Sequence, residues 1–253
     1  MKRWGSEVII EVEDVIKPEK VDEYKKQHAI TWQHLSDIAQ QLIILRRLSN
    51  FPYQLFVPED KRVFWRLTNK SFFDSVVIAF SAIFDKSSEL SLRRFKNKIF
   101  DPKQYRVDKI DLEVDEILRE RTKGFEKKVA SLEEKITEVR NHHIAHLDWK
   151  KVTEPESIVP YQLSIDVLQQ LLDASSSVFH VLGFSTYYDL RSWDYGQSRD
   201  ERNELDIDEI FELVAGQSYW FCDDPIIDFD EEYEKLSDKD KVIFDEWFKR
   251  LGK

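Results

Sequence analysis

The sequence contains very little cysteine, glycine or proline. Cys222 is the only cysteine among the 253 residues, so an intrachain disulfide and any zinc site built from several cysteines are excluded. A single cysteine is also typical of a protein in a reducing compartment, and we therefore expect a cytoplasmic location. Six glycines and seven prolines leave few positions at which a helix must stop, so this composition favours long helices.

Long apolar runs are also scarce. The first twenty residues, MKRWGSEVIIEVEDVIKPEK, carry charges on both sides of one short apolar run, which is not the pattern of a signal peptide. The most apolar stretches, such as VVIAFSAIF at 76–84, are shorter than a membrane-spanning helix requires. We therefore expect no membrane partner.

The charge balance is acidic, with 38 basic and 49 acidic residues and a formal net charge of −11. Long-range forces push such a chain away from a polyanion, which argues against a broad nucleic-acid binder. A protein of this charge that handles RNA must do so through a local basic and imidazole cleft. The pairs Arg46–Arg47 and Arg93–Arg94 are small basic spots that would suit an RNA backbone, although such pairs are more often solvated helix faces.

Apolar residues recur at helical spacing through most of the chain. The expected helices cover 21–48, 59–84, 87–100, 109–147, a segment that follows Pro160 and stops at Gly183, 207–214 and 239–251. The first carries the stripe Ile30, His34, Ile38, Leu42 and Leu45, and the second a broad face from Phe64 to Ile83. The segment 8–16 fits either a strand or a helix start. The sequence thus predicts an all-α, up-and-down helical bundle at 1–187, followed by an acidic, partly helical C-terminal extension at 188–253.

The fourth expected helix, 109–147, carries the most regular seam. Phe125, Val129, Leu132, Ile136 and Val139 are separated by alternating steps of four and three residues. The same alternation continues to His143 and His146, within the stretch RNHHIAHLDW at 140–149. Three of the six histidines therefore gather at the end of this helix.

Three interpretations of these histidines stay open. Imidazoles near the end of a helix often cap carbonyls and have only a structural role. His142 and His146, four residues apart with Asp148 nearby, would suit a divalent metal, but they lack the glutamate of a zincin helix and no second ligand cluster is visible. The third interpretation is acid–base chemistry on a phosphodiester, because imidazole titrates near neutrality and a guanidinium binds phosphate through two parallel hydrogen bonds.

The order Arg140-Asn141-x-x-x-Ala145-His146 resembles the motif of the HEPN superfamily, which lies near the end of a long helix in an all-α bundle. The segments VFWRLTNKSFFDSVVIAFSAIFD, SELSLRRF and VRNHHIAHLD, taken in this order, resemble the abortive-infection, phage-resistance branch of that superfamily. The likeness covers about 21–184, and the acidic extension lies outside it.

This resemblance implies a metal-independent, cofactor-free endoribonuclease of phage defence or toxin type. In it, His146 would be the general base or acid, Arg140 the phosphate clamp and Asn141 the residue that orients the scissile phosphate. The pattern gives His142 and His143 no fixed role, so we treat them as residues that support the site, together with Asp148, which would orient His146 or raise its basicity. The reaction would be attack of the ribose 2′-hydroxyl on the adjacent phosphate, leaving a 2′,3′-cyclic phosphate.

The resemblance also implies partners: RNA, a second copy that completes a composite site, and a neutralising antitoxin. Some toxin members carry a tyrosine two residues after the histidine, which a nucleotidyltransferase modifies; here Asp148 stands there, so we do not predict that control. Two alternative functions remain, a non-catalytic HEPN-like module that binds RNA or protein, and a metal-dependent hydrolase using His142 and His146.

Overall fold

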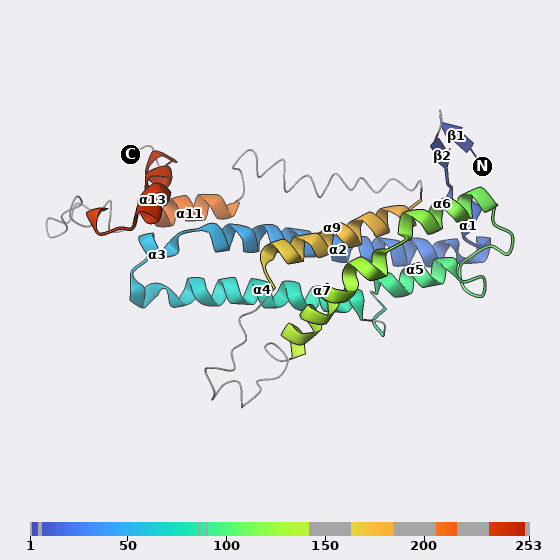
Figure 1. Ribbon diagram of the computed structural model, residues 1–253, viewed down its shortest axis with the longest axis horizontal. Helices are drawn as coiled ribbons and strands as arrows, with labels where there is room; N and C mark the ends of the chain where they lie inside the picture. The colour runs from blue at the N-terminus through green and yellow to red at the C-terminus, as the bar shows by residue number, and fades with distance from the viewer. Residues whose placement is uncertain are drawn as a thin grey trace. The chain divides into compact units, whose positions relative to one another are not determined.

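A computed structural model of the chain describes residues 2–4, 7–85, 87–89, 91–141, 163–184, 206–216 and 233–250 (Figure 1). The chain divides into two compact units, Met1–Leu42 with Phe73–Asp194, and Ile43–Phe72 with Tyr195–Lys253. The predicted all-α class is confirmed. Apart from one short hairpin at the N-terminus, the regular elements of the described residues are helices.

The N-terminal segment contains both structures that its sequence allowed. Strands β1 (Lys2–Trp4) and β2 (Glu7–Ile9) pair antiparallel, and helix α1 (Val12–Val15) begins three residues later. Glu11 and Asp14 cap α1 reciprocally, because the Glu11 backbone N–H donates to Asp14 Oδ2 at 3.0 Å. The 3₁₀ turn η1 (Pro18–Lys20) then leads into the first long helix, α2 (Val21–Asn50).

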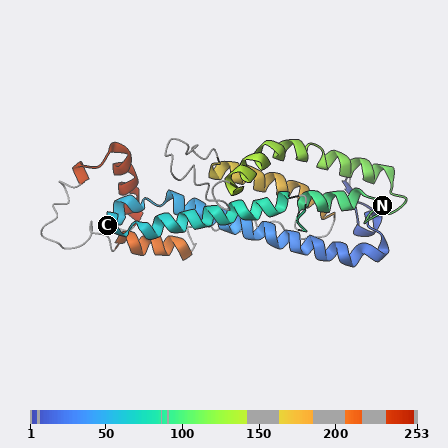
Figure 2. The same ribbon diagram turned by 90° about the horizontal axis from the view of Figure 1, so that it is seen from below.

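The first unit is built around α9 (Ile165–Leu182), which contacts α5 (Leu92–Phe100), α6 (Leu112–Thr122) and α7 (Phe125–Val139) (Figures 1 and 2). Its core also takes side chains from α2 and from α4 (Val63–Phe84). The fully buried apolar side chains of these helices include Leu35, Ile38, Val76, Phe80, Ile83, Leu92, Val114, Val129, Leu168 and Leu171. The seam predicted for α7 is confirmed at Phe125, Val129, Ile136 and Val139, which are all buried.

The expectation of one continuous helix over 109–147 is wrong. The chain turns at Lys123 and Gly124, between α6 and α7. Gly124 has a φ of +79°, in the left-handed region that only glycine adopts without strain. A single glycine inside a helical pattern is tolerated in many helices, so the sequence pattern alone did not reveal this break.

The expected apolar stripe of α2 needs a correction at its N-terminal end. Ile30 is 43% exposed, whereas the buried face passes through His28, Thr31 and Leu35. Thr31 is tolerated there because its hydroxyl donates to the Gln27 carbonyl oxygen at 2.9 Å. His28 and Thr31 thus occupy core positions although they are polar, so the apolar residues alone do not mark the buried face of α2.

Helix α4 also differs from its expected pattern. Phe64 and Leu67, which we placed on its apolar face, are 64% and 54% exposed. Among the described residues, α4 is the one helix that is long and apolar enough to cross a membrane, with a mean hydropathy of 1.2. A core helix meets the same criteria of length and composition, and the side chains of Val76, Phe80 and Ile83 are fully buried.

The second unit has an aromatic core. It contains α3 (Tyr53–Phe56), the 3₁₀ turn η2 (Glu59–Lys61), α11 (Asp206–Gly216) and α13 (Asp238–Arg250). Phe51 stacks on Phe211 with ring centroids 4.3 Å apart, and Phe244 packs near Phe56. The expected acidic extension therefore contributes two helices that pack on the segment 43–72.

Candidate functional site at the end of α7

The motif found in the sequence begins where α7 ends. Arg140 and Asn141 form a π-helical turn after Val139, and the Arg140 backbone N–H donates to the carbonyls of Ile136 and Thr137. His142, His143, His146 and Asp148 lie outside the described residues. The structure therefore places two of the six predicted site residues, side by side on the last turn of the seam helix.

The side chains of Arg140 and Asn141 are joined. Arg140 Nε donates to Asn141 Oδ1 at 3.0 Å, and both residues are half-buried. This bond uses one of the five N–H donors of the guanidinium, and the two terminal nitrogens carry the other four. An arginine held at Nε in this way can present both terminal nitrogens to a phosphate, the geometry that favours two parallel hydrogen bonds.

Arg140 faces a cavity of about 270 Å³ between the end of α4 and α7. The cavity is lined by Ser81, Phe84, Asp85, Glu133, Ile136, Thr137 and Arg140. The hydroxyl and backbone N–H of Ser87 both donate to Asp85 Oδ1, at 2.7 and 2.8 Å. These bonds, with a smaller attraction from Arg140, hold the pKa of the Asp85 carboxyl below its usual range. An ionised carboxylate thus lies within electrostatic reach of Arg140.

A second cavity, of about 410 Å³, lies on the Asn141 side of the same helix. Glu133 and Thr137 line both cavities, so the two hollows flank one stripe of α7. Arg140 and Asn141 therefore each open onto space large enough for a polar group of a substrate.

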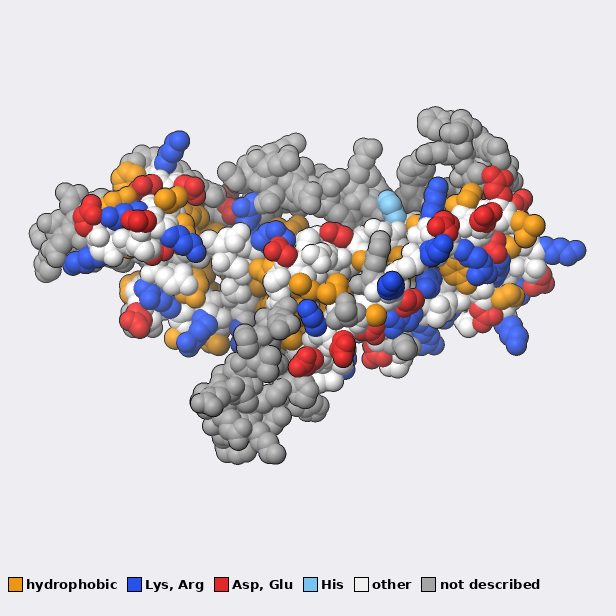
Figure 3. Space-filling view, in the orientation of Figure 1, with side chains coloured by type: hydrophobic (Ala, Val, Ile, Leu, Met, Phe, Trp, Pro, Cys, Tyr) orange, Lys and Arg blue, Asp and Glu red, His pale blue; other side chains and the backbone are white. Residues whose placement is uncertain are grey.

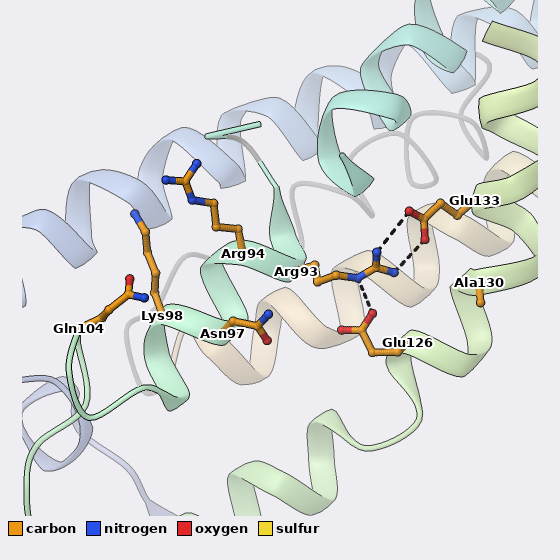
Figure 4. Close-up of a pocket in the computed structure, with 8 residues that line it drawn as sticks. All are labelled: Arg93, Arg94, Asn97, Lys98, Gln104, Glu126, Ala130 and Glu133. Atoms are coloured by element: carbon orange, nitrogen blue, oxygen red, sulfur yellow. Dashed lines mark hydrogen bonds and ion pairs between the residues drawn. The ribbon is translucent and has the colours of Figure 1, made fainter. Parts of the chain in front are cut away.

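Glu133 is held by a cluster of charges between α5 and α7, drawn in Figure 4. Arg93 Nη2 and Nη1 donate to the two oxygens of Glu133 at 2.8 and 3.2 Å, and Arg93 Nε donates to Glu126. Lys96 Nζ donates to the other oxygen of Glu126 at 2.8 Å. Burial raises the pKa of Glu126, but Lys96 and Arg93 outweigh that effect and leave the pKa below its usual value.

The sequence pattern gave no indication of the carboxylates around Arg140. Arg93 stood out only as part of a basic pair, yet it forms ion pairs with Glu126 and Glu133, 33 and 40 positions later in the chain. Asp85 and Glu133 carried no signal, because isolated acidic residues on helices are common in a chain of this composition.

A metal site has no support within the described residues, which hold no group of three or more histidine, cysteine, aspartate or glutamate side chains arranged around a common point. The metal interpretation rests on His142 and His146, which lie outside the described part of the chain. The effect of a chelator on the activity of the purified protein therefore tests the metal interpretation.

The chain matches the family model of AbiU2, a HEPN family, over residues 24–207. Comparisons with curated proteins and with solved structures gave no significant match. The matched segment includes most of α2, all of α4, α7 and α9, the cavities beside α7 and the whole Arg140–His146 motif. The chain therefore belongs to the AbiU2 family of HEPN proteins, a family associated with abortive infection.

Proposed function

We propose that the protein is a metal-independent endoribonuclease of bacterial phage defence or toxin type, acting in the cytoplasm. The observation that carries this proposal is the position of Arg140 in a chain of a HEPN family, at the end of α7, where it is hydrogen-bonded to Asn141 and faces a cavity. Such a guanidinium suits the charge that develops on a phosphate during its transesterification.

The proposed reaction needs no cofactor. The ribose 2′-oxygen forms a bond to the adjacent phosphorus while the bond from phosphorus to the 5′-oxygen of the next nucleotide breaks. A base removes the proton of the 2′-hydroxyl, and an acid gives a proton to the leaving 5′-oxygen. We assign one of these roles to His146, while Arg140 stabilises the charge on the non-bridging oxygens and Asn141 orients the phosphate.

We further propose that two copies of the chain form one composite site. Among the described residues that line the Arg140 cavity, Arg140 is the one cation, while Asp85 and Glu133 carry carboxylates. One copy therefore offers little net attraction to a phosphate. A homodimer would bring a second arginine and a second histidine to the same cleft, so that one imidazole serves as base and the other as acid.

The remaining parts of the proposal concern the other residues and partners. His142 and His143 would hold the catalytic side chains in position without contacting the RNA, and Asp148 would orient the His146 ring. The bundle at 1–187 would carry the nuclease activity, with 188–253 as an acidic extension. A toxin of this kind also requires a neutralising antitoxin in the host cell.

Cleavage of RNA by purified protein in excess EDTA tests the proposal. Arg140→Ala should lower the rate about 10²–10³-fold, and His146→Ala about 10²–10⁴-fold. Two matched controls, Arg66→Ala and His180→Ala, replace exposed residues outside the site and should keep full activity. Circular dichroism should show unchanged helix content in all four variants.

The outcomes separate the alternatives. Activity lost with EDTA and restored by a divalent metal would favour a metal-dependent hydrolase using His142 and His146. RNA binding without cleavage would leave a binding module. Full activity of both Arg140→Ala and His146→Ala would refute the assigned roles.

A further inference from the structure

Three cavities border α7 and share part of its surface. Glu133 lines all of them, Ala130 lines two, and the two at the C-terminal end also contain Arg140 and Asn141. The third and largest, of about 800 Å³, lies over α5 and is drawn in Figure 4. From Ala130 to Arg140 the helix rises about 15 Å. The hollow over α5 therefore lies a few nucleotides away from the proposed phosphate clamp, all within the first unit.

Seven of the eight residues that line the α5 cavity have polar or charged side chains, and the eighth is Ala130. Arg94 and Lys98 lie one helical turn apart on α5, and in Figure 4 both extend toward α2. Asn97 lies between them in sequence, and Gln104 comes from the loop after α5. In Figure 3, Lys and Arg side chains gather over the part of the first unit where α5 and α6 lie, with acidic side chains among them.

The cations of this cavity differ in how strongly they are neutralised. Arg93 is 12% exposed and is bound to both Glu126 and Glu133, so it is not available to a ligand. Arg93 in turn offsets the charge of Glu133, so this carboxylate repels a nearby anion less strongly than an unpaired one would. Arg93 and Lys96 together balance the charges of Glu126 and Glu133 at the side of the α5 cavity next to α7.

Arg94 and Lys98, in contrast, are available to an anion. Arg94 is 40% exposed, and its ion-pair partner Glu89 is 71% exposed, so their bond at 2.7 Å is a surface salt bridge that a stronger anion can replace. Lys98 contacts neutral groups, the Gln27 amide oxygen at 3.5 Å and the face of the Tyr105 ring at 5.4 Å. The Glu23 carboxylate also attracts Lys98, as the lowered pKa of Glu23 shows, but Lys20 and Tyr105 are the groups that donate hydrogen bonds to Glu23.

We propose that the α5 cavity is a binding site for the sugar–phosphate backbone of single-stranded RNA, next to the cleavage site. Arg94 and Lys98 would bind phosphates, and the amides of Asn97 and Gln104 would bond ribose hydroxyls or base edges. This inference rests on the proposed function, because it takes RNA as the substrate. It also explains how a chain of net charge −11 can hold RNA, through two local cations rather than through its overall field.

Fluorescence anisotropy with a labelled 2′-O-methyl oligoribonucleotide measures binding without cleavage, because such a strand lacks the attacking hydroxyl. The test variant is Arg94→Gln with Lys98→Gln, and the control is Lys61→Gln with Arg66→Gln, which removes the same charge from exposed residues of the second unit. The test variant should bind about tenfold more weakly, and its plot of log K against log salt should be less steep by about 1.4. The control should bind as the wild type does.

Equal affinities of the test and control variants would overturn the site, as would a wild type that binds no RNA. A test variant that loses affinity for an acidic peptide as strongly as for RNA would show a general anion site instead. Thermal melting of both double variants, with midpoints within a few degrees of the wild type, excludes misfolding as the cause.

Cleavage of ordinary RNA is assayed separately, so that this site and the nuclease proposal can fail independently. Cleavage by the wild type, together with unchanged affinity of the test variant for RNA, would refute the proposed binding site and support the proposed nuclease activity. Weaker binding of RNA by the test variant, without cleavage by the wild type, would support the binding site and refute the nuclease activity.

Discussion

The guanidinium of Arg93 donates two hydrogen bonds to the carboxylate of Glu133, at 2.8 and 3.2 Å, and so joins α5 to α7 about two turns before Arg140. The two side chains are only 12% and 26% exposed, so the pair is partly shielded from water. It fixes the wall that the three cavities along α7 have in common.

Glu133→Gln should therefore lower the free energy of unfolding by about 1–2 kcal/mol, because an ion pair with two hydrogen bonds is replaced by one hydrogen bond from Arg93 to an uncharged amide. Urea denaturation monitored by circular dichroism measures this change. Glu134→Gln, at the exposed neighbouring position, should change the stability by less than about 0.5 kcal/mol. Equal effects of the two variants would show that the ion pair does not stabilise the fold.

Asp85→Asn should strengthen the binding of RNA about two- to threefold, because it removes an ionised carboxylate that attracts Arg140. An asparagine keeps the oxygen that accepts both hydrogen bonds from Ser87, so the turn should survive. Anisotropy with an uncleavable strand at low salt measures the effect. Asp37→Asn is a suitable control for the loss of one negative charge, since Asp37 is not among the residues that line the Arg140 cavity.

His28 should make the fold sensitive to acid. Its ring is 2% exposed and stacks on Phe179 at 4.3 Å, and burial lowers its pKa from 6.5 to about 4. The unfolded chain, with the ordinary pKa, takes up this proton first as the pH falls. His28 therefore costs no stability above about pH 6.5, and the cost grows to roughly 3 kcal/mol as the pH falls to about 4.

The comparison of the wild type with His28→Gln isolates this effect, since the other titrating groups are common to both. Urea denaturation at pH 7.5, 6.5, 5.5 and 4.5 should show a difference in stability between the two proteins that shrinks steadily toward low pH. Parallel stability curves over this range would contradict the assignment.

Gly124→Ala should lower the free energy of unfolding by about 1–2 kcal/mol, because alanine at a φ of +79° is strained. Gly216→Ala is the matched control. A Cβ at either position would meet no atom within 4 Å, but Gly216 has no positive φ and ends a helix. Gly216→Ala should therefore be neutral or stabilising, by at most about 1 kcal/mol. A loss at Gly216 as large as at Gly124 would show that backbone strain is not the cause.

Much of the helical pattern could be predicted from the sequence, because periodicity and caps are local. The helix expected at 21–48 is observed at Val21–Asn50, Ser91 and Ser164 cap α5 and α9 as acceptors, and Gly183 follows the last residue of α9. The seam of α7 is confirmed as far as Val139, and Arg140 follows it directly; its predicted continuation to His143 and His146 lies outside the described residues.

What could not be predicted depends on residues far apart in the chain. The bonds of Arg93 to Glu126 and Glu133 depend on how α5 packs beside α7, and no local pattern encodes that packing. The burial of His28 depends on Phe179 of α9, more than 150 positions later. The break between α6 and α7 at Gly124 could not be predicted for a different reason, because a single glycine does not end every helix in which it occurs.

The most direct test of the account is the chemistry of the RNA ends that the wild-type protein produces in excess EDTA. Mass spectrometry of a short oligoribonucleotide should find fragments with a 2′,3′-cyclic phosphate and fragments with a free 5′-hydroxyl. Arg140→Ala should produce neither at a comparable rate. Fragments with a 5′-phosphate, or intact RNA that is cut only after a divalent metal is added, would contradict the account.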